Sequence, residues 1–206
     1  INTVTNLFKL LDKKNLLNGQ KFDIKIVKNV PQESGMGGGS MNAASLISFF
    51  IKKKILKIKK NELKKLTSQI GSDVILGIKP TNTILSNNGD IKKYNNGIKF
   101  YVLIVKPSFG CSTKYIYSKV KSFSKPQFNF PKSKMFEVKY LKSLKNDLEK
   151  IVFKKYPKLK EIKSFLSNNS PNMFVRMSGS GSSIVAYFDS MRECGKAYSQ
   201  FKRKFD

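Results

Sequence analysis

The chain has 206 residues, of which 40% are hydrophobic and 12% aromatic, so it can bury one large core or two smaller ones. Its sequence contains neither an apolar run long enough to span a membrane nor a charged-then-apolar leader, and we expect neither a membrane protein nor a secreted one. It has no histidine and two cysteines, Cys111 and Cys194. This composition excludes Ser-His and Cys-His catalysis, the usual zinc enzymes and a disulfide framework, and a reducing cytoplasm is the default expectation.

The net charge of +27 suggests a polyanionic partner, RNA or DNA. Only three of the 40 basic residues are arginine, however, and the lysines are spread over the whole chain. Nucleic-acid readers usually exploit the bidentate fork of arginine. We therefore expect the lysines to fill solvated surfaces and consider nucleic acid an unlikely partner. A basic RNA-binding module that uses the Lys-rich residues 52–65 is the alternative.

In the first half of the chain, residues 1–11 can form a helix, and residues 22–26 alternate between apolar and polar side chains as a strand does. A glycine-rich stretch opens the next helix, which runs to about residue 53. Another helix is predicted over residues 61–70, with Asn61 as its N-cap and Gly71 at its end. The polar residues 86–90 predict a turn.

In the second half, residues 98–106 predict a strand and residues 113–121 a helix. Two helices follow within residues 136–166, then strands over 173–177 and 183–188 and a helix over 191–204. This order predicts a ferredoxin-like split βαβ arrangement without its last strand. We expect two domains, residues 1–95 and 96–206.

The most informative stretch is residues 30–44, "VPQESGMGGGSMNAA". Consecutive glycines allow positive φ and bring backbone N–H groups close to a ligand. A helix that begins directly afterwards adds its own unpaired N–H groups and the positive end of its dipole. The combination predicts an anion cradle suited to phosphate. A glycine turn that only packs strand against helix is the alternative.

Two common phosphate loops do not fit this stretch. No lysine follows the glycines as the Walker pattern requires, and Ser40 stands where the dinucleotide pattern has its third glycine. The stretch does resemble the P-x-x-x-G-L-G-S/G-S/G-S loop of the GHMP kinase superfamily.

Four further segments resemble that superfamily in the right order: "IGSDV" (70–74), "KPSFGCST" (106–113), "NDLE" (146–149) and "RMSGSGSSIVAYF" (176–188). The resemblance implies an α+β fold with two α/β subdomains, the second ferredoxin-like. It also implies a kinase acting on a small-molecule alcohol. The details are most similar to the branch that phosphorylates the 2-hydroxyl of CDP-methylerythritol in the non-mevalonate isoprenoid pathway, which operates in the bacterial cytoplasm and in plastid-type organelles. Mevalonate-type and homoserine kinases are the alternatives within the superfamily.

The resemblance also assigns roles to residues, with ATP and Mg²⁺ as the cofactors. Asp73 is implied as the catalytic base that accepts the proton of the substrate hydroxyl, and a helix N-cap is its alternative role. Ser40 is the implied Mg²⁺ ligand. The ATP phosphates are implied to lie against Gly35, Met36, Gly37, Gly38, Gly39 and Ser40.

Other positions have weaker implied roles. Asn2 falls where the superfamily contacts adenine, although it could equally be a helix cap. Residues Ser178, Gly179, Ser180 and Gly181 are implied to support the phosphate loop, with a simple hairpin connection as the alternative. For Asn146 and Asp147 we expect a helix cap. Cys111 and Thr113 are only possible neighbours of the substrate.

The sequence departs from the superfamily pattern in several places. Glu33 would repel phosphates if it faced them, so we expect it to point outward. Met41 replaces a serine, and Ile75 stands where proline is usual. The N-terminal strand with its lysine and the last strand are absent, so we expect a fragment that is poorly active alone, monomeric or weakly dimeric.

Overall fold

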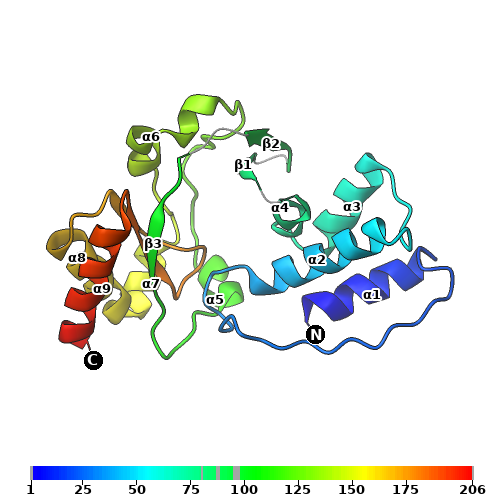
Figure 1. The fold of residues 1–206 in the computed structure, drawn as a ribbon, viewed down its shortest axis with the longest axis horizontal. Coiled ribbons are helices and arrows are strands. Elements are labelled where there is room, and N and C mark those ends of the chain that lie inside the picture. The colour runs from blue at the N-terminus through cyan, green and yellow to red at the C-terminus, as the bar shows by residue number, and fades with distance from the viewer. Residues whose placement is uncertain (1, 80, 87–88, 95–97, 206) are drawn as a thin grey trace. The chain divides into compact units, whose positions relative to one another are not determined.

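The computed structural model describes residues 2–79, 81–86, 89–94 and 98–205. The chain forms two compact units, and each contains segments that are distant in sequence (Figure 1). Unit 1 comprises Ile1–Asn29, Gly37–Asn95 and Pro126–Pro131, and unit 2 comprises Val30–Met36, Asn96–Lys125 and Lys132–Asp206. The first half of the glycine-rich stretch therefore belongs to unit 2 and its second half to unit 1. The domain boundary expected after residue 95 remains a prediction.

Unit 1 consists of helices and one hairpin. Its elements are α1 (Thr3–Lys13), α2 (Gly38–Lys52), α3 (Lys60–Ile70), α4 (Val74–Ile78), β1 (Asn82–Leu85) and β2 (Ile91–Tyr94), the last two paired antiparallel. Figure 1 shows α1 and α2 lying alongside each other. Their apolar faces meet in a core that includes the fully buried Leu7, Leu11 and Ile47. This core fixes the start of α2, where the glycine-rich stretch ends.

The strand predicted over residues 22–26 is wrong, because the structure has no regular secondary structure there. No strand among the described residues pairs with this segment, and an unpaired strand leaves its backbone groups without partners. Phe22 is nevertheless used for packing. Its ring centroid lies 4.8 Å from that of Phe50 and 6.2 Å from that of Phe8. The sequence thus identified Phe22 correctly as an apolar residue that packs in the core, but it predicted the wrong backbone conformation.

Three details of unit 1 differ from the sequence predictions. Helix α3 begins one residue before Asn61, and its N-cap is Lys59, whose N–H donates to the Glu62 carboxylate over 3.2 Å. Residue 61 is thus inside the helix. The short helix α4 and the β1–β2 hairpin were not predicted. Of the turn predicted over residues 86–90, residues 87–88 lie outside the described residues, and the Ser86 N–H donates to the Asp90 carbonyl over 2.8 Å.

Unit 2 is an α+β arrangement around one sheet. Its elements are β3 (Tyr101–Val105), α5 (Thr113–Ser118), η1 (Ser133–Phe136), α6 (Val138–Ser143), α7 (Glu149–Lys155), α8 (Pro157–Asn169), β4 (Phe174–Met177), β5 (Ile184–Phe188) and α9 (Met191–Phe205). Three helices, α6 to α8, occupy the region where two were predicted. The strands run antiparallel in the order β3-β5-β4.

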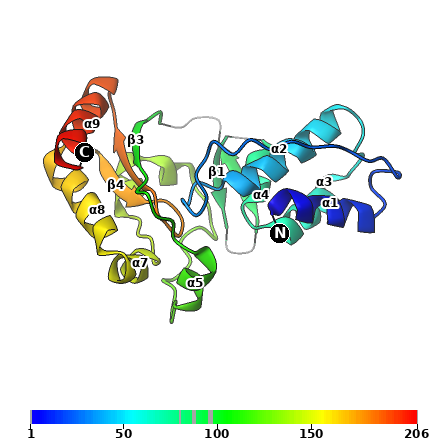
Figure 2. The same cartoon turned by 90° about the horizontal axis from the view of Figure 1, so that it is seen from below.

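The core of unit 2 lies between this sheet and two long helices. Helix α8 contacts β4 and β5, and α9 contacts β3 and β5 (Figure 2). The register pairs Val105 with Ile184 and Met177 with Ile184, so the three strands meet at one buried position. The β4–β5 connection begins directly beyond it, at residues 178–183. Within the described part of the chain, no helix is long and apolar enough to cross a membrane.

Candidate active site

The first half of the glycine-rich stretch is bonded to the β4–β5 connection within unit 2. The Glu33 carbonyl accepts from the backbone N–H groups of Cys111, at 3.0 Å, and Ser182, at 3.2 Å. The Ser34 carbonyl accepts from the N–H of Ser183 at 3.0 Å. The backbone of this segment is therefore fixed by the fold of unit 2.

Gly35 continues this attachment and has no room for a side chain. Its carbonyl accepts from the Ser178 hydroxyl at 2.8 Å. Its φ is +72°, and a Cβ added there would lie 2.0 Å from the Ser178 carbonyl oxygen. Gly179 packs against it with a φ of +52°. At Gly35, therefore, a neighbouring segment of the protein and not a ligand excludes a side chain.

The second half of the stretch has a different environment. Gly37 is the N-cap of α2 in the left-handed conformation, with φ 66° and ψ 17°, and a Cβ added there would meet nothing within 4 Å. No side chain caps this helix end. Among the described residues, none accepts from the backbone N–H groups of Gly38, Gly39 or Ser40. These groups form an open set of donors at the positive end of a 15-residue helix.

Gly39 and Met41 are explained by packing within unit 1. A Cβ at Gly39 would lie 2.7 Å from the Thr3 hydroxyl oxygen, so glycine there allows α1 and α2 to approach each other. A Cβ at Gly77 in α4 would lie 2.8 Å from the Met41 sulfur. The methionine that departs from the superfamily pattern thus packs against α4.

Asp73 lies directly before α4, in the segment next to the start of α2. A Cβ added at Gly71 would lie 3.9 Å from the Ser40 hydroxyl oxygen, which places the 71–73 segment beside the N-terminus of α2. Asp73 is exposed and occupies the N-cap position of α4, but its side chain makes no cap hydrogen bond. It accepts from the Ser72 hydroxyl at 3.1 Å. Its carboxylate is therefore not used as a helix cap.

Asn2, in contrast, is a helix cap. Its Oδ1 accepts from the Thr5 N–H at 2.9 Å and from the Thr5 hydroxyl at 3.2 Å. This bonding accounts for an asparagine at the start of α1 and leaves its side-chain NH₂ without an acceptor among the described residues.

The turn over residues 178–181 is supported on its other side by residues of the "NDLE" segment. Asn146 donates its side-chain N–H groups to the carbonyls of Met177, at 3.1 Å, and Gly179, at 2.8 Å. Its Oδ1 accepts from the Leu148 N–H at 3.0 Å. Asn146 thus joins the segment before α7 to this turn. The helix cap expected at Asn146 and Asp147 is wrong, because the N-cap of α7 is Leu148 and no described side chain makes a cap hydrogen bond at that helix end.

Glu149 is a supporting residue that the sequence reasoning missed. Its Oε1 accepts from the Met177 N–H at 3.0 Å, and its Oε2 pairs with Lys163 at 2.6 Å. The "NDLE" match contained Glu149, but its position inside a helix gave no sign of these contacts. The hydroxyls of Ser180 and Thr113 also meet, at 2.8 Å, and join the turn to the start of α5.

Cys111 and Glu33 complete the surroundings of the turn. Burial, together with the nearby Glu33 carboxylate, raises the pKa of the Cys111 thiol to about 11, so the thiol is protonated and unreactive at neutral pH. Glu33 is exposed, and its carboxylate lies over Gly110. In the described part of the chain, no cluster of three or more His, Cys, Asp or Glu side chains could hold a metal ion.

Comparisons with known proteins agree on one family. Residues 2–81 match the GHMP kinases N terminal domain, and residues 138–206 match GHMP kinases C terminal. The chain is 66% identical over all its 206 residues to the 4-diphosphocytidyl-2-C-methyl-D-erythritol kinase of Pelagibacter ubique (strain HTCC1062), of which it covers 73%. It is 32% identical to the kinase of the same name from Clostridium novyi (strain NT), with 95% of this chain and 71% of that protein covered.

The fold agrees as well. A crystal structure of 4-(cytidine 5'-diphospho)-2C-methyl-D-erythritol kinase matches 96% of this chain and 74% of its own, with a TM-score of 0.71 and 20% identity. At that identity the likeness concerns the fold alone. Together with the two domain matches, it confirms the predicted α+β fold of the superfamily.

Proposed function

Because this chain belongs to the 4-diphosphocytidyl-2-C-methyl-D-erythritol kinase family of the GHMP kinases, we propose that it transfers the γ-phosphoryl group of ATP to the 2-hydroxyl of that cytidine-linked alcohol. The observation that carries the proposal is the open end of α2, where no described residue accepts from three of the N–H groups or caps the helix with its side chain. Membership of the family also confirms the resemblance drawn from the five sequence motifs. A cytoplasmic location, as expected for a bacterial enzyme of this kind, is part of the proposal.

The donors for the phosphates come from the glycine-rich stretch. The N–H groups of Gly38, Gly39 and Ser40 are oriented by the helix and have no protein acceptor among the described residues. Phosphoryl transfer depends on positioning and on neutralising phosphate charge, which preorganised N–H groups supply without reorganisation. Gly37 leaves space for the ligand. Gly35 and Met36 contribute by setting the course of the backbone that precedes Gly37.

Mg²⁺ would supply charge neutralisation for the phosphates. No cluster of acidic side chains among the described residues could hold it. The Ser40 hydroxyl at the start of α2 is then the protein group that we assign as the one that would hold it. Asn2 has a free side-chain NH₂ group next to its cap, and we assign it a contact with adenine.

Asp73 is the residue that we assign as the base. Three features support this role: the side chain is exposed, it makes no cap bond, and its segment lies beside Ser40. A base must reach the hydroxyl proton as the oxygen attacks phosphorus, so a carboxylate that is near the phosphate donors and is not used as a helix cap suits the role. The Ser72 hydroxyl, 3.1 Å away, orients the carboxylate.

The test measures labelled phosphoryl transfer from Mg-ATP to the cytidine-linked alcohol by the protein at its full natural length. Asp73→Asn keeps the side-chain shape and removes the base, and we expect the turnover to fall by about 10²- to 10⁴-fold. Asp12→Asn is the matched control, because Asp12 is another exposed acid of unit 1 and its contact with Lys21 is long, at 3.9 Å. The control should keep normal turnover.

Two results would contradict parts of the proposal. Near-normal turnover by Asp73→Asn would show that Asp73 is not the base, while the proposed reaction itself would still hold. A folded protein that binds ATP but does not phosphorylate this alcohol would redirect the substrate to the other alcohols of the superfamily, mevalonate or homoserine, which the same assay can test in competition.

A further inference from the structure

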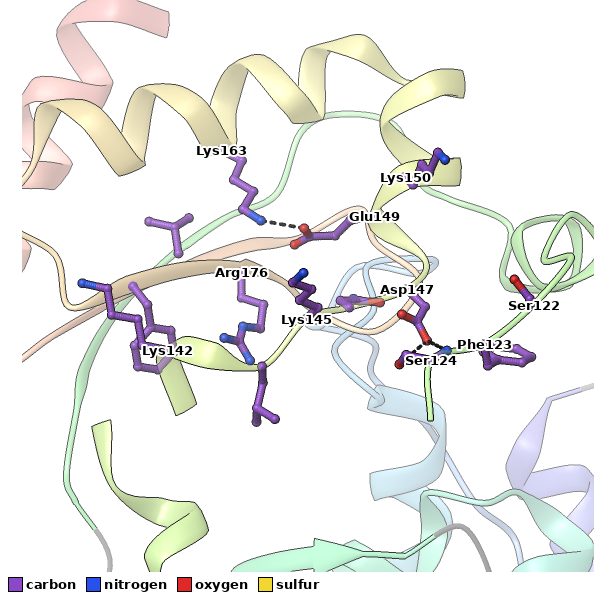
Figure 3. Close-up of a pocket in the computed structure, with 14 residues that line it drawn as sticks. Ser122, Phe123, Ser124, Lys142, Lys145, Asp147, Glu149, Lys150, Lys163 and Arg176 are labelled. Atoms are coloured by element: carbon purple, nitrogen blue, oxygen red, sulfur yellow. Dashed lines mark hydrogen bonds and ion pairs between the residues drawn. The ribbon is translucent and has the colours of Figure 1, made fainter. Parts of the chain in front are cut away.

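Unit 2 contains a pocket of about 610 Å³ that does not involve the glycine-rich stretch (Figure 3). Its volume is within the range of about 300 to 1,000 Å³ that is typical of small-molecule sites. Three segments form its walls: the connection after α5, the region from α6 to the start of α7, and β4 with Lys163 of α8. The lining residues are Ser122, Phe123, Ser124, Lys142, Leu144, Lys145, Asn146, Asp147, Glu149, Lys150, Lys163, Phe174, Val175 and Arg176.

Cations outnumber acids in this lining, and both acids are already used. Asp147 accepts from the Ser124 N–H at 2.8 Å and from the Ser124 hydroxyl at 2.9 Å, which fastens one wall to another (Figure 3). Glu149 is paired with Lys163 and with the backbone of Met177. The acids therefore hold the walls together, and with five cations against two acids the lining keeps a net positive charge.

Three lysines of the lining are left without partners. The side chains of Lys142, Lys145 and Lys150 make no ion pair and no hydrogen bond within the described part of the chain. All three are exposed, like most lysines of this chain. These three share one concave surface, which concentrates the positive potential and attracts anions.

Arg176 adds to the pocket a cation that is held in place by its neighbours. It is one of three arginines in the chain, and its guanidinium donates to the Leu141 carbonyl and lies 5.3 Å from the centre of the Phe174 ring. Burial lowers its pKa, yet arginine keeps its charge at neutral pH. Among the described residues, Leu141 alone accepts a hydrogen bond from its guanidinium. The other N–H donors of the guanidinium form a preorganised fork of the kind that binds phosphate oxygens.

We propose that this pocket is a second phosphate-binding site, which takes the diphosphate group of a small molecule. Several cations on a concave wall match a multiply charged anion better than a single phosphate or carboxylate. Phe123 and Leu144 provide apolar surface beside the cations for the rest of such a molecule. The site does not include the residues of the nucleotide site at α2, so this proposal can be tested independently of the proposed kinase activity.

The test uses a fluorescent reporter at the pocket wall. The chain has no tryptophan, and Phe123 lines the pocket with 63% of its surface exposed, so Phe123→Trp introduces a single local probe. The probe is titrated with inorganic pyrophosphate, with sulfate at equal ionic strength as the comparison. Tyr198→Trp is the matched reporter on α9, which is exposed to 54% and does not line the pocket.

We expect a saturable response of the Phe123→Trp reporter to pyrophosphate, with a Kd of about 1 mM or lower and weaker binding of sulfate. The Tyr198→Trp reporter should not change. Adding Lys142→Gln and Lys145→Gln should raise the Kd by about tenfold or more, because charge-assisted contacts to phosphate are lost. The charge-matched pair Lys154→Gln and Lys160→Gln, both exposed and outside the lining, should change it by less than about twofold.

Some outcomes would overturn the proposal. A response that rises without saturation, or that the two pairs of substitutions weaken equally, would mean that the anion only samples the general positive field of the protein. Equal affinity for sulfate and pyrophosphate would remove the assignment to diphosphates. The four lysines are exposed, so the variants should fold, and circular dichroism checks that they do.

Discussion

The two halves of the glycine-rich stretch differ in what surrounds them. Around residues 33–35 the carbonyls accept hydrogen bonds from neighbouring segments of unit 2, and a Cβ at Gly35 would lie 2.0 Å from another backbone. Around residues 37–40 the N–H groups have no acceptor among the described residues, and Gly37 faces open space. Neighbouring glycines of one stretch are thus required for different physical reasons. One half is fixed by the protein, and the other is available to a ligand.

The largest effect should come from Gly35→Ala, which tests the fixed half. The new methyl group would collide with the Ser178 carbonyl oxygen, and alanine is strained at the φ of +72°. Overpacking and the left-handed conformation together should lower the free energy of unfolding by about 4 kcal/mol, measured by urea denaturation.

Gly19→Ala is the control for Gly35→Ala, because Gly19 has a φ of +75° and nothing within 4 Å of an added Cβ. It isolates the cost of the backbone conformation, about 1 kcal/mol. If the two substitutions cost the same, the close approach of residue 178 does not contribute.

A smaller loss is expected from Asn146→Ala, which removes the support behind the turn. Asn146 donates to the Met177 and Gly179 carbonyls and accepts from the Leu148 N–H. Three hydrogen bonds at about 1 kcal/mol each predict a loss of roughly 2 to 3 kcal/mol in the free energy of unfolding.

Asn146→Asp sharpens this prediction, because aspartate keeps the acceptor for Leu148 and loses both donors. A carboxylate that faces two carbonyls should make this variant at least as unstable as Asn146→Ala. A stability close to that of the unmodified chain would show that the donors are not needed. Both measurements use the same denaturation assay.

The open half is tested by Gly37→Ala, with a smaller effect on folding. Nothing lies within 4 Å of the new methyl group, so the loss should match that of Gly19→Ala, about 1 kcal/mol. ATP binding, measured by calorimetry, should nevertheless weaken in Gly37→Ala and stay unchanged in Gly19→Ala. Equal ATP affinity in the two variants would mean that the ligand does not approach residue 37.

This division between fixed and open glycines explains what the sequence could predict. The pattern of glycines followed by an apolar helix indicated the family, and it located the open helix end that we propose as the phosphate donor, because the conformation of a short backbone segment depends mainly on neighbouring residues. It could not show that Gly35 meets residue 178, since that contact joins segments 143 residues apart. The contacts of Glu149 were hidden for the same reason.

The sequence also predicted wrongly where secondary structure depends on pairing with another strand. Alternation around Phe22 predicted a strand, but a strand forms only when another strand accepts its hydrogen bonds, and none of the described segments does so. Phe22 kept its place in the core because burial needs only a neighbouring apolar surface, here Phe8 and Phe50. Apolar periodicity therefore identifies burial more reliably than it identifies backbone pairing.

The smallest net effect is expected at Gly39, and its sign should depend on one neighbour. An added methyl group would lie 2.7 Å from the Thr3 hydroxyl oxygen but 3.6 Å from the Thr3 Cβ. Replacing glycine by alanine inside a helix stabilises by about 1 kcal/mol, while the close contact costs a similar or slightly larger amount. Gly39→Ala alone should therefore be neutral or destabilising by up to about 1 kcal/mol.

In a Thr3→Ala background the obstructing hydroxyl is gone, and Gly39→Ala should become stabilising by about 1 kcal/mol. The double-mutant cycle, measured by urea denaturation without nucleotide, gives the interaction energy of the two positions directly. An interaction energy of zero would mean that α1 does not impose glycine at residue 39. The requirement for glycine at residue 39 would then come from the ligand side of the helix, as we propose for Gly37.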